Sequence, residues 1–213
     1  MAIITISRQF GAGGRTLGRM IAKKMDYLYL DETIIEKIAE KAKVSKASVK
    51  SMERTAGGKL SKFFSIMLNQ DYMNRILGET KGYIDEDLYF KLLNEIITEL
   101  ADEGNVLVMG RGGQYILSEH KDAIHIYLVS DMENKISFMQ RFYKVDEAKA
   151  KRMIEQGEKM RTNFYSKFGK SDYDNPLLYH LVVNRSKFNI DETVDLICEY
   201  VNIRQKSMTT PKQ

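Results

Sequence analysis

Hydrophobic positions along the chain follow two patterns: short continuous apolar runs, and longer stretches in which apolar residues recur at helical spacing. A continuous run is typical of a strand buried on both faces of a sheet, and the second spacing is typical of an amphipathic helix. The predicted strands are residues 2–6, 27–30, 106–109, 123–129 and 181–183. The predicted helices are residues 17–25, 32–42, 44–54, 59–77, 84–101, 131–143, 146–164 and 190–203. Because strands alternate with helices, the pattern predicts an α/β fold with a parallel sheet.

Length and composition narrow the class of protein. The 213 residues suit one domain, or one core with an inserted lid. The net charge is +4, and the lysine and arginine residues alternate with aspartate and glutamate along the predicted helices. This mixture indicates a solvated helical surface and no nucleic-acid partner. No apolar run is long enough to cross a membrane and no signal peptide is recognisable, so we expect a cytoplasmic protein without a membrane partner.

The segment after the first predicted strand, residues 7–16, reads S-R-Q-F-G-A-G-G-R-T and is called the glycine-rich loop below. Glycines let backbone N–H groups turn inward, and the N-terminus of the following helix adds partial positive charge, so this loop is predicted to bind phosphate. It does not satisfy the usual pattern G-x-x-x-x-G-K-[ST], because no register supplies the lysine. Arg8 and Arg15 are the nearby cations. An ordinary turn between strand and helix is the alternative.

Ligands of parallel α/β sheets bind beyond the carboxyl ends of strands. Two further candidates lie at such ends: Asp31, and residues 110–113, which read G-R-G-G and are called the GRGG turn below. Arg111 stands between glycines, where a purely structural arginine is uncommon. Asp31 either orients a ligand or caps the helix that begins at Glu32.

Residues 4–15 resemble the opening of the cytidylate kinase-like family, which carries S-R-Q-x-G-[SA]-G-G-R in place of the usual P-loop. Four further segments are similar to motifs of that family: residues 29–31 (Y-L-D), 108–113 (V-M-G-R-G-G), 158–161 (E-K-M-R) and 179–186 (Y-H-L-V-V-N-R-S). The resemblance reaches about Tyr200 and is loose over residues 44–80.

The resemblance implies a three-layer α/β sandwich of the P-loop NTPase type, with a five-stranded parallel sheet, a helical insert that binds a nucleoside monophosphate, and a lid. It implies one domain over residues 1–205, with a core of residues 1–43 and 84–205, an insert over residues 44–83 and a lid over residues 144–175. Residues 206–213 would then be a polar tail.

The resemblance also implies ATP and Mg²⁺ as cofactors and phosphoryl transfer to a nucleoside monophosphate, CMP or dCMP. The chain departs from the family where the loop lysine is absent and where His180 replaces an acid. Two alternatives therefore stay open: a nucleotide-binding protein without efficient turnover, and a kinase of a different small-molecule acceptor. A dinucleotide-binding loop, based on Gly11-Ala12-Gly13 and Asp31, is a weaker third.

Phosphoryl transfer needs positioning and positive charge, which arginine forks supply well. The catalytic candidates are Arg15, Arg141, Lys159 and Arg161. The candidates for binding the donor nucleotide are Arg8, Gly11, Ala12, Gly13, Gly14, Arg15 and Thr16, and Thr16 is also the candidate for Mg²⁺. The candidates for binding the acceptor are Asp31, Gly110, Arg111, Gly112 and Gly113. Arg141 lies on a charged helix, a position that favours a solvated surface residue over a catalytic one.

Two other groups of residues are considered as a metal site and as a homodimer face, and the sequence supports these less well. The three histidines, His120, His125 and His180, are too scattered in the sequence to indicate a metal cluster. An apolar stripe at Phe63, Phe64, Ile66, Met67 and Met73 fits packing between helices, and it also fits the face of a homodimer.

Overall fold

The computed structural model describes residues 2–55 and 84–209. The chain divides into two compact units. The first comprises Met1–Leu30, Thr98–Glu158 and Asp172–Gln213, and the second comprises Asp31–Ile97 and Lys159–Ser171. The helix predicted over residues 59–77, and with it the apolar stripe considered for a homodimer, lies outside the described residues.

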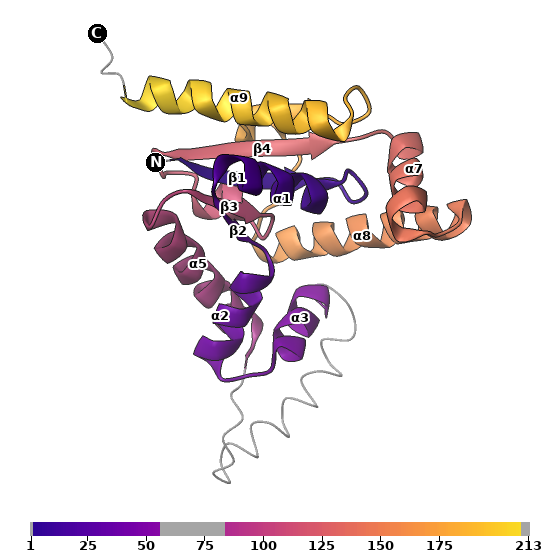
Figure 1. Cartoon of the computed structure of the whole chain (residues 1–213). Coiled ribbons are helices and arrows are strands. Elements are labelled where there is room, and N and C mark those ends of the chain that lie inside the picture. Colours follow the sequence, from indigo (N-terminus) through magenta and orange to yellow (C-terminus); the bar gives the residue numbers. More distant parts are fainter. Residues whose placement is uncertain (1, 56–83, 210–213) are drawn as a thin grey trace. The chain divides into compact units, whose positions relative to one another are not determined.

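A five-stranded parallel sheet forms the centre of the first unit, as predicted (Figure 1). Its strands are β1 (Ile3–Arg8), β2 (Leu28–Leu30), β3 (Val106–Met109), β4 (Ala123–Val129) and β5 (Leu181–Asn184). They lie in the order β2-β3-β1-β4-β5, with Ile3 opposite both Val106 and Ala123. The glycine-rich loop therefore leaves the middle strand of the sheet, and the GRGG turn leaves the strand beside it.

The helices follow the predicted periodicity. They are α1 (Gly14–Met25), α2 (Glu32–Ala42), α3 (Lys46–Thr55), α5 (Glu86–Asp102), α7 (Met132–Tyr143), α8 (Glu147–Lys167) and α9 (Ile190–Thr209). The structure adds the four-residue helix α6 (Gly113–Ile116) and the 3₁₀ turn η1 (Pro176–Leu178), both too short to produce a periodic pattern. None of the helices among the described residues is long and apolar enough to cross a membrane.

One face of the sheet is covered by α1 and α9. Ile4 and Ile6 of β1 pack there in a cluster with Leu17 of α1 and Ile197 of α9, and all four side chains are fully buried. Each such burial stabilises the fold by about 1.5–3 kcal/mol. Since successive strand residues point to opposite faces, Thr5 lies on the other side of the sheet.

The second unit has its own contacts. The hydroxyl of Tyr89 in α5 donates to the carboxylate of Glu53 in α3 at 2.8 Å. The ring of Phe90 packs edge-on against Phe168, with ring centroids 4.6 Å apart, and also contacts Phe164. These aromatic side chains pack on one another inside the unit.

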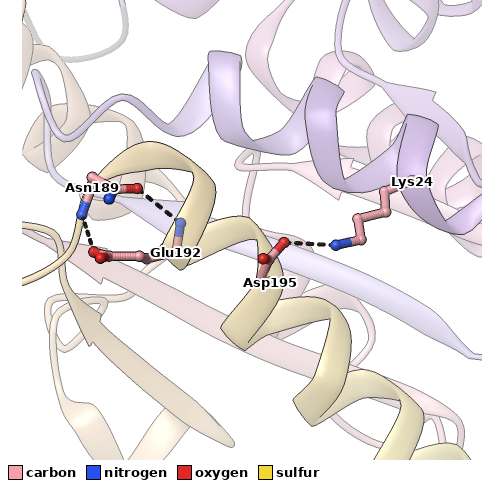
Figure 2. Close-up of polar contacts among 4 residues, drawn as sticks. All are labelled: Lys24, Asn189, Glu192 and Asp195. Carbon is pink, nitrogen blue, oxygen red and sulfur yellow. Dashed lines mark hydrogen bonds and ion pairs between the residues drawn. The ribbon is translucent and has the colours of Figure 1, made fainter.

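Helix α9 begins with a capping box, which Figure 2 shows. The Glu192 backbone N–H donates to the Asn189 side chain at 2.9 Å, and the Asn189 N–H donates to the Glu192 carboxylate at 2.8 Å. Two N–H groups that a helix end would leave unsatisfied are paired in this way. Farther along α9, the Asp195 carboxylate forms an ion pair with the ammonium group of Lys24 in α1, with Oδ1 and Nζ 2.6 Å apart.

Replacing Asn189 with alanine is expected to lower the free energy of unfolding by about 1 kcal/mol, because the Glu192 N–H loses its acceptor. Urea denaturation followed by circular dichroism measures the change. Lys24→Ala removes only an exposed ion pair and is the control. It should lower the free energy of unfolding by less than Asn189→Ala does. Equal effects of the two variants would contradict a role for the capping box.

Candidate functional site

The glycine-rich loop joins the end of β1 to the start of α1. Gly11 and Gly13 have φ angles of +84° and +77°, in the left-handed region that glycine adopts at little cost. Gly13 is the N-cap of α1 and provides no side-chain cap. The N–H groups of a helix's first turn have no partner within the helix, and they carry partial positive charge. The start of α1 is therefore suited to an anion such as phosphate.

Two side chains of α7 pack directly on the loop glycines. A Cβ atom added at Gly11 would lie 3.1 Å from Cβ of Lys135, and one added at Gly13 would lie 3.1 Å from the ring of Phe138. Both distances are tighter than ordinary side-chain contacts. The glycines thus have two roles, because they permit the left-handed backbone and they also let α7 approach the loop.

The first part of α8 also holds the loop. Gly157 lies under the ring of Phe10 so closely that an added Cβ would overlap the ring. Glu158 is the next residue of α8, and the Phe10 backbone N–H donates to its carboxylate. On the opposite side, the amide oxygen of Gln9 accepts from the N–H of Ser130 at 3.0 Å. The loop is thereby attached to β4 and to α8.

Arg8 links the glycine-rich loop to the GRGG turn. Its stem lies against Gly14, where an added Cβ would be 2.8 Å from Cγ of Arg8. Its guanidinium group lies against Gly110, so closely that an added Cβ would overlap it. The ends of β1 and β3 therefore share one arginine side chain.

The GRGG turn holds three consecutive residues in the left-handed region: Gly110 at φ +71°, Arg111 at +51° and Gly112 at +72°. Glycine adopts this conformation readily, but an arginine there costs about 1 kcal/mol. Strain at a partly buried arginine beside a strand end is an observation that supports a functional role for Arg111.

A buried hydrogen bond joins the start of the glycine-rich loop to the helix that follows the GRGG turn. The hydroxyl of Ser7, at the end of β1, donates to Oε1 of Gln114 in α6 at 2.9 Å. The Nε2 group of Gln114 is buried and has no hydrogen-bond partner among the described residues. An unsatisfied buried donor costs about 1–3 kcal/mol. Sequence reasoning missed Gln114, although it directly follows the GRGG turn.

Comparison with known proteins identifies the family of this chain. Residues 3–187 match the model of the cytidylate kinase-like family. The chain belongs to this family. Membership confirms the resemblance to this family that the sequence motifs indicated.

Solved structures agree with the fold of this cytidylate kinase-like chain. An uncharacterized protein from Eubacterium ventriosum superposes with a TM-score of 0.64 at 19% identity, covering 95% of this chain and 99% of that one. A shikimate kinase from Acinetobacter baumannii, solved with shikimate, gives 0.50 at 14% identity, covering 96% and 94%. At these identities the similarity shows the fold alone. No protein of curated function matches the sequence.

The structure brings most of the predicted nucleotide-binding residues of the cytidylate kinase-like chain to one edge of the sheet. They lie at the carboxyl ends of β1 and β3: Arg8, Gly11, Ala12, Gly13, Gly14, Arg15, Thr16, Gly110, Arg111, Gly112 and Gly113. Within this set, Arg15 is exposed on the first turn of α1. The roles of these residues stay predictions.

The other predicted site residues are placed differently. Arg141 is exposed near the end of α7, with its guanidinium carbon 5.5 Å from the centre of the Phe142 ring. Lys159 and Arg161 lie on the part of α8 that belongs to the second unit. Asp31, also in the second unit, is 2% exposed and occupies the N-cap position of α2. Its side chain makes no capping hydrogen bond, so capping does not account for this buried carboxylate.

The fold also brings together two histidines that are far apart in the sequence. The rings of His125 and His180 have centroids 5.2 Å apart. Nδ1 of His125 is hydrogen-bonded to the hydroxyl of Thr5 at 2.8 Å. Burial, and secondarily the neighbouring His180, lowers the pKa of His125 to about 4. Over residues 2–55 and 84–209, no group of three or more His, Cys, Asp or Glu residues could hold a metal ion.

Proposed function

We propose that this chain transfers a phosphoryl group from ATP to a nucleoside monophosphate, with CMP or dCMP as the acceptor. The observation that carries the proposal is the Arg8 side chain, which lies against both Gly14 and Gly110. This contact supports the proposal that the glycine-rich loop binds the donor phosphates and that the neighbouring GRGG turn binds an acceptor phosphate. Transfer between two phosphates requires such neighbouring anion sites, since catalysis consists mainly of positioning and charge.

The residues at these loops fit a magnesium-bound nucleotide. The uncapped start of α1 and the close-packed glycines leave backbone N–H groups for phosphate oxygens. Thr16, in the first turn of α1, would hold Mg²⁺ through its hydroxyl, and the ion would neutralise phosphate charge. Arg15 would bind the donor phosphates and Arg111 the acceptor phosphate. The acceptor oxygen is already a nucleophile, so no general base is needed.

The absent loop lysine favours a second candidate function. A chain that binds nucleotide through backbone N–H groups but lacks that cation could hold ATP without efficient turnover. A kinase of another small-molecule acceptor also fits the same donor loop.

The deciding experiment measures phosphate transfer from ATP with Mg²⁺ to a panel of nucleoside monophosphates. We expect transfer to CMP or dCMP, with kcat/KM lowered about 100-fold in Arg111→Ala, because one charged contact to the acceptor phosphate is lost. The kcat/KM of Arg15→Ala should be lowered as well. Lys23→Ala, an exposed cation in the last turn of α1, is the matched control and should match the unsubstituted protein.

The other results are equally informative. ATP binding without transfer to any nucleotide would favour the non-catalytic protein or a different acceptor. Transfer that survives both arginine substitutions would place the reaction elsewhere in the molecule.

A further inference from the structure

A buried lysine from a distant part of the sequence lies on the glycine-rich loop, which has no lysine of its own. Lys135 of α7 is 8% exposed. Its Cβ and Cγ atoms lie 3.1 and 3.3 Å from the position of a Cβ added at Gly11. Three single bonds separate Cγ from the ammonium nitrogen, which therefore lies within about 4 Å of Cγ. The stem of this cationic side chain therefore lies against Gly11.

Helix stability and apolar packing do not by themselves require a lysine at this position. Lys135 is the fourth residue of α7, near the helix N-terminus, where a positive charge is unfavourable to the helix dipole. Lysine is also among the residues least often buried, because an ammonium group loses hydration there. Its neighbour Ile136 and the next turn's Met139 show that an apolar residue could fill such space on this helix.

The two arginines of the loop contact other parts of the site. The Arg8 side chain lies along Gly14 and ends at Gly110, at the boundary with the GRGG turn. Arg15 is exposed on the first turn of α1. Lys135 alone among these three contacts the interior of the loop, at Gly11, where the backbone is in the left-handed conformation.

We propose that Lys135 replaces the missing loop lysine and binds the phosphate groups of the nucleotide held by the glycine-rich loop. The inference rests on the proposed function, because it assigns a role at the same nucleotide site. It accounts for a loop that departs from the usual pattern at its most strongly charged position. The cation comes from the helix after β4 and not from the loop itself.

The experiment measures binding of two probes, MgATP and inorganic tripolyphosphate, by isothermal titration calorimetry. Lys135→Met keeps the apolar stem against Gly11 and removes the charge. We expect both affinities to fall about 10- to 100-fold, as for loss of one charge-assisted hydrogen bond. Lys135→Arg retains the charge and should stay within about threefold of the unsubstituted protein. Lys149→Met, on the exposed first turn of α8, is the control and should bind as before.

Thermal unfolding accompanies each titration. If Lys135→Met lowers the unfolding temperature markedly, Lys135→Arg decides the matter: folded Lys135→Arg protein with weak binding would overturn the proposal. Binding by Lys135→Met within twofold of the unsubstituted protein would overturn it too, while leaving the proposed function intact. An unsubstituted protein that binds neither probe would instead refute the proposed function, and with it this inference.

Discussion

Alanine at position 157 is expected to lower the free energy of unfolding by about 1–2 kcal/mol and to weaken MgATP binding at least tenfold. The added Cβ would overlap the Phe10 ring, and overpacking of this kind costs about 1–3 kcal/mol. The better helix propensity of alanine returns up to about 1 kcal/mol, so the net effect is destabilising. The binding loss follows because Phe10 belongs to the glycine-rich loop and donates its N–H to Glu158.

A double substitution tests this mechanism directly. In a Phe10→Ala background there is no ring to displace, so Gly157→Ala should become stabilising by up to about 1 kcal/mol. Chemical denaturation of the four proteins gives the coupling energy, and calorimetry gives the MgATP affinity. The same loss of stability with and without the Phe10 ring would show that the glycine is needed for another reason.

The protein is expected to lose about 3 kcal/mol of stability between pH 6.5 and pH 4 through His125 alone. The pKa of His125 is about 4 in the folded chain, against an ordinary value of 6.5. Between these values the unfolded chain binds a proton that the folded chain does not, so stability falls as the pH falls. Below pH 4 both states are protonated, and this contribution changes no further.

Urea denaturation across this pH range measures the effect. His125→Asn should flatten the stability profile between pH 6.5 and pH 4, because the titrating group is gone. His180→Asn should retain most of the slope, since burial is the larger cause of the lowered pKa and the charge of His180 the smaller one. A profile for His125→Asn as steep as that of the unsubstituted protein would show that other groups control acid unfolding.

The packing of Phe10 and Gly157 shows how much of the site local patterns can predict. The glycines of the loop are visible in the sequence because they cluster between a strand and a helix. Gly157 is not, since it stands alone inside a long helical pattern. A single helical glycine has no local signal for its purpose, and the ring that requires it lies almost 150 residues away.

The His125–His180 pair is a second contact that local sequence patterns do not predict. His125 and His180 are 55 residues apart, and nothing in the local sequence around either one indicates that they meet. Parallel pairing of β4 and β5 brings His125 and His180 together. Strand register is a long-range property, so separation in the sequence says little about distance across a sheet.

Local patterns in the sequence were enough to predict the order of strands and helices, the parallel α/β class, the family and the two glycine-rich segments at strand ends. These follow from local periodicity and from motifs whose residues are contiguous, so a single pass along the chain detects them. Three contacts became evident only in the folded chain: Arg8 connects the two segments, the Phe10 ring requires Gly157, and Lys135 lies on Gly11. Each of these contacts joins residues from different elements, and burial and close packing across the fold, not local spacing, determine which side chains meet.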